Sequence, residues 1–141
     1  MKVNPPLIEY RKIGLLSTCI GNERIRVDTE GKLYHARNHH ECTPGEFWSD
    51  EWKLVGELDN ATLATLVKDI KESGVLSLPP ATTDEVTEGG KREELFLMID
   101  EVEQCYVVQN CDQPVLKTVI ELLWGAEENL VQSRNNNKPY C

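Results

Sequence analysis

The sequence lacks most of the patterns by which enzymes and membrane proteins are recognised. It contains no P-loop, no dinucleotide-binding glycine pattern, no H-E-x-x-H and no G-x-S-x-G. No apolar run approaches the roughly 18 residues that a membrane-spanning helix requires. The first residues, MKVNPPLIEY, also lack the apolar segment of a signal peptide. We therefore expect a cytoplasmic protein that does not bind a membrane. The missing motifs favour a protein that is not an enzyme and uses no cofactor.

Cysteine pairs with metal-binding spacing and a surplus of positive charge are also missing. The five cysteines show no C-x-x-C spacing, so in a reducing compartment most of them should be plain thiols. The net charge of the chain is −9. Nucleic-acid affinity comes largely from Lys and Arg that neutralise phosphates, so no nucleic-acid partner is expected. The basic residues between positions 24 and 37 are interpreted as a solvated strand face.

What the sequence does contain is an alternation of strands and helices in a chain of one-domain length. Its 141 residues predict a single domain over residues 1–132 and a flexible tail at 133–141. Alternating or continuous apolar runs predict strands, at residues 7–15, 23–28, 32–37, 51–58, 95–100 and 104–110. Each of two helices has a narrow apolar stripe that must be buried, and one face of a sheet can bury both stripes. We therefore predict an α+β fold, with a mostly antiparallel sheet of five to six strands and two amphipathic helices on one face.

Both helices carry start signals and an apolar stripe with i, i+3, i+4, i+7 spacing. In the first helix, Asp59 is the predicted N-cap and Gly74 the residue that ends the helix. Its stripe consists of Leu63, Leu66, Val67 and Ile70. The second helix begins with Pro114 and ends at Gly125 or one turn later. Its stripe consists of Leu116, Val119, Ile120 and Leu123.

This order of elements resembles that of a group of small bacterial domains, most of them uncharacterised. The shared features are a strand with a glycine turn, a Leu-x-x-Leu helix, a Gly-x-Leu-x-Leu-Pro exit, a hairpin and a proline-started helix. The corresponding segments here are Ile13-Gly14, 63–70, 74–79, 95–108 and 114–123. One branch with a similar layout, the emfourin-like proteins, inhibits thermolysin-type metalloproteases. The resemblance implies a small α+β domain and, for a member of that branch, a protease inhibitor.

The densest group of metal-binding side chains lies between positions 35 and 42. Zinc takes imidazole nitrogen and thiolate sulfur in tetrahedral geometry, which makes candidate ligands of His35, His39, His40 and Cys42. The same segment offers Cys42 as a nucleophile with a histidine base. The alternative to both is a polar surface loop. This segment is the basis of one functional hypothesis, a small metal-binding protein or enzyme.

Large aromatic residues follow in the same loop and support a different hypothesis. Phe47 and Trp48, if exposed, would anchor a protein partner, because interface hot spots favour large aromatic side chains. The alternative is that they plug the edge of the sheet, and Trp52 is expected to face the core. The missing catalytic motifs and the acidic composition favour a non-catalytic protein-binding or regulatory domain. A protease inhibitor is one form of such a domain.

Two cysteines and an acidic segment complete the candidates. Cys105 shares a strand face with Val107 and is interpreted as a core thiol. Cys111 precedes a helix, whose N-terminus can lower a thiol pKa and suit it to redox sensing. The acidic residues lack the D-x-D-x-D-G order of a calcium loop, so a solvated loop is predicted for Asp84, Glu85, Glu88, Glu93 and Glu94.

Overall fold

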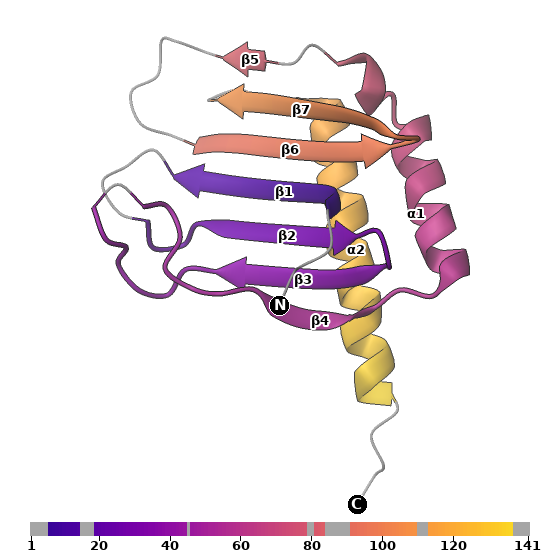
Figure 1. Cartoon of the computed structure of the whole chain (residues 1–141), viewed down its shortest axis with the longest axis horizontal. Helices are drawn as coiled ribbons and strands as arrows, with labels where there is room; N and C mark the ends of the chain where they lie inside the picture. The colour runs from indigo at the N-terminus through magenta and orange to yellow at the C-terminus, as the bar shows by residue number, and fades with distance from the viewer. Residues whose placement is uncertain are drawn as a thin grey trace, which may run out of the picture.

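The computed structural model describes residues 6–14, 19–44, 46–78, 81–83, 91–109 and 113–136. Seven strands form one sheet, and two α-helices and a short 3₁₀ helix accompany it (Figure 1). The strands are β1 (Pro6–Gly14), β2 (Glu23–Asp28), β3 (Lys32–Arg37), β4 (Lys53–Glu57), β5 (Ala81–Thr83), β6 (Lys91–Ile99) and β7 (Val102–Gln109). The helices are α1 (Asn60–Glu72), η1 (Val75–Ser77) and α2 (Pro114–Asn136). None of these helices is long and apolar enough to cross a membrane.

The strands follow the order β4-β3-β2-β1-β6-β7-β5 across the sheet. Six of them pair antiparallel, while β5 adds a short parallel strand beside β7. The α+β class and the antiparallel sheet predicted from the sequence are thereby confirmed. The strand β1 lies in the middle of the sheet, between β2 and β6.

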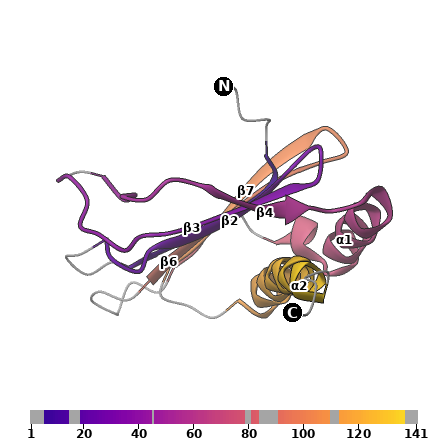
Figure 2. The same ribbon diagram turned by 90° about the horizontal axis from the view of Figure 1, so that it is seen from below.

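Both helices cover the same face of the sheet, so the protein has two layers (Figure 2). The core lies between them and is built from the alternate strand residues that point toward the helices. Its fully buried strand residues include Ile8, Ile25, Val27, Leu33, Leu95 and Leu97. The opposite face of the sheet carries no helix among the described residues.

The helix α1 begins and ends where the sequence predicts. The carboxylate of Asp59 accepts a hydrogen bond from the backbone N–H of Thr62 at 2.7 Å, which satisfies one free donor of the first turn. Leu66 and Ile70 are buried and belong to the hydrophobic core. Gly74 has a φ of 84°, a left-handed conformation that glycine adopts without strain and that ends the helix.

The helix α2 is longer than predicted, since it passes through Gly125 and ends at Asn136. Leu116, Val119 and Leu123 of its stripe are buried. Residues 133–136, assigned from the sequence to the tail, are helical, and residues 137–141 lie outside the described residues. The acidic loop predicted around Asp84–Glu94 is shorter than expected, because β6 already begins at Lys91 and includes Glu93 and Glu94. Residues 81–83 form the short strand β5.

Candidate functional site

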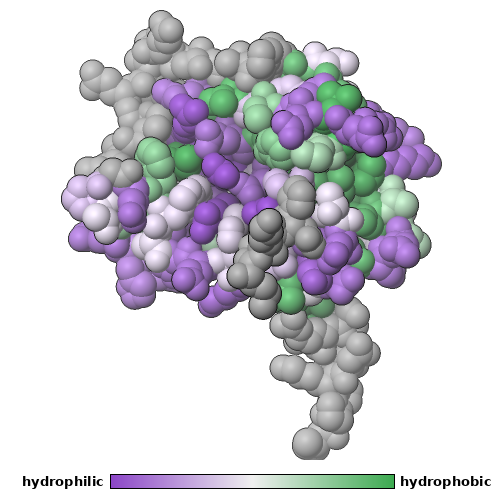
Figure 3. Space-filling model, in the orientation of Figure 1, coloured by the Kyte–Doolittle hydropathy of each residue, from purple (hydrophilic) through white to green (hydrophobic). Residues whose placement is uncertain are grey.

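The face of the sheet opposite the helices carries polar and aromatic side chains, and it is turned toward the viewer in Figure 3. Hydrophilic side chains predominate there, with hydrophobic ones between them. The pairing register places successive residues of neighbouring strands side by side on this face. One such row runs from β7 to β4 and consists of Cys105, Phe96, Glu9, Arg26, Tyr34 and Leu54. We call this surface the open face.

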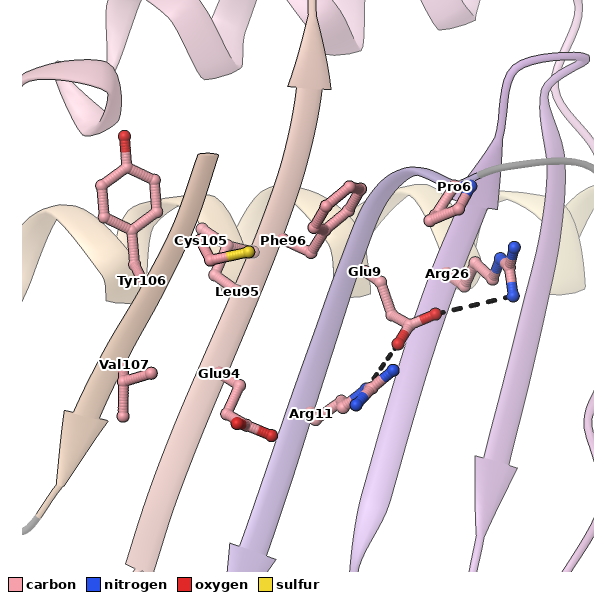
Figure 4. A pocket seen from close by; sticks show the side chains of 10 residues that line it. All are labelled: Pro6, Glu9, Arg11, Arg26, Glu94, Leu95, Phe96, Cys105, Tyr106 and Val107. Carbon is pink, nitrogen blue, oxygen red and sulfur yellow. Dashed lines mark hydrogen bonds and ion pairs between the residues drawn. The ribbon is translucent and has the colours of Figure 1, made fainter. Parts of the chain in front are cut away.

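A shallow hollow of about 440 Å³ lies on the open face across β7, β6, β1 and β2 (Figure 4). Glu9 is only 4% exposed, and its carboxylate lies 2.5 Å from Nε of Arg11 and 3.6 Å from Nη1 of Arg26. Charge pairing of this kind makes burial of a carboxylate acceptable. Phe96 and Val107 supply apolar surface beside it. Cys105, Glu94 and Tyr106 also line the hollow.

Arg24 fastens the chain after β3 onto the open face. Its guanidinium lies 4.6 Å from the ring centroid of Trp48 and 4.2 Å from that of Trp52. Its Nη2 also donates a hydrogen bond to the backbone carbonyl of Asp50 at 3.2 Å. Burial lowers the pKa of Arg24 below its ordinary value, yet a guanidinium stays charged at neutral pH. The expectation that Trp52 faces the core is wrong, because the indole stacks on a cation of the open face instead.

Asn38 holds the chain that follows β3; we call its described residues, 38–44 and 46–50, the 38–50 loop. This buried amide donates from Nδ2 to the carbonyl oxygens of Phe47, at 2.7 Å, and Cys19, at 3.0 Å. Its Oδ1 accepts the backbone N–H of Ser49 at 3.1 Å. Asn22 donates a second hydrogen bond to the Phe47 carbonyl at 3.1 Å. Two side-chain amides therefore hold the loop at one point.

A disulfide between Cys19 and Cys42 joins the same loop to the turn before β2, with the two Cα atoms 6.1 Å apart. Cys105 is a free cysteine, and Cys111 and Cys141 lie outside the described residues, so the expectation that most of the cysteines are plain thiols stays a prediction. The sequence hid the pair because the partners are 23 positions apart and follow no spacing rule. In the disulfide, Cys42 offers no thiolate to a metal ion or a substrate.

The two predicted anchor residues occupy different environments. Trp48 is half-buried, and its ring stacks on the guanidinium of Arg24 on β2. Phe47 is 57% exposed, although its own carbonyl is held by two amides. The structure thus presents one large aromatic side chain on a fixed backbone.

The three histidines are separated in role. His35, on β3, faces the helices, and its Nδ1 lies 2.8 Å from Oε1 of Glu127 on α2. Its Nε2 lies 3.6 Å from Oε1 of Glu23, and its ring meets that of Trp124 edge-on. The hydrogen bond to Glu127 and the ion pair with Glu23 raise the pKa of His35 to about 9. This imidazolium therefore ties α2 to β2 and β3.

The proposed metal ligands do not converge. His39 and His40 are exposed in the 38–50 loop, and Cys42 is in the disulfide. His35 and His39 both line a small hollow with Asp50 and Glu51. Across the described part of the chain, no three His, Cys, Asp or Glu side chains lie close enough together to hold a metal ion.

The remaining candidates have mixed outcomes. Cys105 is exposed on the open face, so its interpretation as a core thiol is wrong. Side chains alternate along β7 as predicted, but the buried set that faces the helices is Tyr106 and Val108, and not Cys105 and Val107. Glu93 is buried and accepts a hydrogen bond from Tyr10 at 2.6 Å. Glu94 pairs with a neighbouring arginine. The other candidates, Cys111, Asp84, Glu85 and Glu88, lie outside the described residues.

No family model matches the chain, and no curated protein matches it. The residues that fix the loop were not singled out from the sequence. For Arg24 a signal existed, because strand alternation places it on the polar side of β2 while tryptophans follow at positions 48 and 52. For Asn38 no sequence signal existed, because its partners are backbone groups brought near by the fold.

Proposed function

We propose that this protein is a non-catalytic protein-binding domain that recognises its partner with the 38–50 loop. The observation that carries the proposal is the exposed Phe47 on a backbone fixed by Asn22 and Asn38. Aromatic side chains supply much of the binding energy in protein interfaces. A loop that is already ordered loses little conformational entropy when it binds, so more of this energy appears as affinity.

The surroundings of Phe47 support the same proposal. The disulfide and the stacking of Arg24 between two tryptophans hold the loop on either side of this residue. The adjoining open face combines paired charges with apolar surface, as the rim of an interface does.

A protease inhibitor is the narrower form of this proposal. Inhibitors of proteases commonly present a preorganised segment whose backbone changes little on binding, and a disulfide-tethered loop fits that description. The resemblance to emfourin-like proteins names thermolysin-type metalloproteases as the targets to test. Titration of the protein into thermolysin should abolish peptidase activity at a stoichiometric ratio. A flat titration would reject the inhibitor form while leaving other partners open.

The broader proposal is tested by comparing two substitutions of exposed apolar residues. Phe47→Ala removes the anchor, while Val102→Ala alters a side chain that is 53% exposed at the β6–β7 turn. Both sites are on the surface, so each change should alter the free energy of unfolding by less than about 0.5 kcal/mol. Immobilised wild-type protein is used to isolate a partner from native lysate, and the affinities of both variants are then measured with that partner.

We expect Phe47→Ala to weaken binding by roughly 30-fold, corresponding to a hot-spot loss of about 2 kcal/mol. Val102→Ala should retain the wild-type affinity. Equal affinity of the Phe47→Ala variant and the wild type would reject the loop as the recognition element. Recovery of no partner from lysate under mild conditions would count against the protein-binding function itself.

A further inference from the structure

A groove of about 400 Å³ lies between α1 and α2, on the helical side of the molecule (Figure 2). Its floor contains the buried side chains of Leu66 and Ala126, together with Leu122. The α1 side is formed by small side chains, Ala61, Thr62 and Thr65. The groove therefore has an apolar floor and a wall of small side chains on its α1 side. It is separate from the 38–50 loop, whose Trp48 and Asp50 contact Arg24 on the open face.

Gly125 lines this groove although it stands inside the long helix α2. Glycine destabilises a helix interior relative to alanine, because it loses more backbone freedom on folding. A Cβ atom added at Gly125 would meet no atom within 4 Å, so the protein's own packing does not require glycine there. Gly56 differs, since a Cβ atom there would come within 3.3 Å of Leu130. Glycine at position 125 therefore leaves the groove open beside α2.

The charges around the groove have one sign. Asp69 of α1 and Glu121 of α2 are its charged lining residues, and no Lys or Arg lines it. Neither carboxylate forms an ion pair with a Lys or Arg of the described residues. A partner that carries positive charge beside an apolar stripe would satisfy both features of the surface.

We propose that this groove binds an amphipathic helix of a partner protein, with a stripe of small and apolar residues flanked by Lys or Arg. Helices that dock into apolar grooves use such stripes at i, i+3, i+4 and i+7. The distance between packed helices depends on the side chains at their contact, and glycine allows the closest approach. A second copy of this chain is a poor occupant, because the chain has a net charge of −9. Pairing of two such grooves would also bring Asp69 and Glu121 against like charges.

The test uses two synthetic helical peptides of about five turns, each with an Ala/Leu stripe. One peptide carries Lys beside the stripe and the other carries Glu at the same positions. Binding to the full chain is followed by fluorescence anisotropy at physiological salt. We expect saturable binding of the Lys peptide and none of the Glu peptide. Absence of saturable binding of the Lys peptide up to 1 mM, about the weakest affinity of a specific site, would overturn the proposal.

Substitutions then locate the binding surface. Gly125→Leu fills the groove and should weaken the Lys peptide at least tenfold, while improved helix propensity keeps the fold intact. Gly125→Ala should raise the melting temperature by roughly 2–4 °C and leave binding nearly unchanged. The double substitution of Asp69→Asn with Glu121→Gln should also weaken binding at least tenfold. Glu51→Gln with Glu103→Gln makes the same change in net charge at exposed sites outside the groove and should have little effect.

Three results would overturn the proposal at this stage. One is equal weakening by the two charge-neutralised double variants, which would show attraction to the acidic protein as a whole. Another is unchanged peptide affinity in the Gly125→Leu variant. The third is a dimer in sedimentation equilibrium that Gly125→Leu dissociates, since the occupant would then be a second copy. Phe47→Ala should leave peptide binding unchanged, so the outcome for the groove is independent of the outcome for the 38–50 loop.

Discussion

The contact of His35 with Glu127 and Glu23 should make the stability of the protein depend on pH. The imidazole Nδ1 lies 2.8 Å from Glu127 and Nε2 lies 3.6 Å from Glu23, and these partners raise the pKa to about 9. In the unfolded chain an imidazole has a pKa of about 6.5. The folded state therefore holds the proton more tightly. The resulting stabilisation is complete below pH 6.5 and is lost as the pH rises through 9.

The magnitude follows from the two pKa values. Each pH unit between them corresponds to 1.36 kcal/mol, so the difference sets an upper limit of about 3 kcal/mol. The His35 side chain is 26% exposed, and solvent and salt weaken ion pairs that water can reach. We therefore expect about 1–2 kcal/mol. The lowered pKa of Glu23 arises first from its interaction with His35 and describes the same contact, so it is not added.

The assay is urea unfolding of the wild type and the His35→Gln variant between pH 6 and pH 10, followed by tryptophan fluorescence. Glutamine cannot take up the proton, so the stability difference between the proteins isolates the contribution of His35. That difference should be largest at pH 6 and fall by about 1–2 kcal/mol by pH 10. Glu127→Gln should remove more than half of the pH dependence while leaving the imidazole in place. A constant difference across the range, or an imidazole titrating near pH 6.5 in NMR spectra, would refute the reasoning.

Two further predictions concern the core and the disulfide. Leu66→Ala should cost about 2–5 kcal/mol in urea unfolding, because the Leu66 side chain is buried in the hydrophobic core. A loss below about 1 kcal/mol would contradict the buried stripe. Non-reducing peptide mapping should find a peptide pair linked through Cys19 and Cys42, and Cys42→Ser should cost about 3 kcal/mol through restored chain entropy. Recovery of both residues as free thiols from protein purified without reductant would contradict the disulfide.

The sequence correctly predicted those strands and helix ends that are determined by residues close together in the chain. The strands at 23–28 and 32–37 agree with β2 and β3, because strict alternation and the intervening turn specify both. Asp59 and Gly74 mark the ends of α1 because capping depends on neighbouring residues alone. Gly125 misled the prediction of where α2 ends. Glycine is common at helix ends, but the apolar packing of α2 stabilises the helix on both sides of Gly125, and the helix continues to Asn136.

The parts of the candidate site that could not be predicted join residues far apart in sequence. His35 and Glu127 meet only because α2 crosses β3, and nothing in their local sequences indicates it. Strand alternation correctly groups the side chains that share a face with Trp52 or Cys105. Which of the two faces is buried depends on where the helices pack, and the local sequence does not show this. The early start of β6 at Lys91 was missed because Lys, Arg and Glu open it, and pairing with β1 fixes that segment.

The central position of β1 has a consequence for the order in which the chain becomes available during synthesis. β1 is made first, yet its partner β6 begins only at Lys91. Until then the growing chain holds β2, β3 and β4 on one side of β1 and an unpaired row of backbone groups on the other. Unpaired strand edges invite association with other chains. A nascent chain stalled before β6 should therefore aggregate or require a chaperone. In the folded protein, β6 pairs with this edge of β1 and leaves no unpaired backbone groups between the two strands.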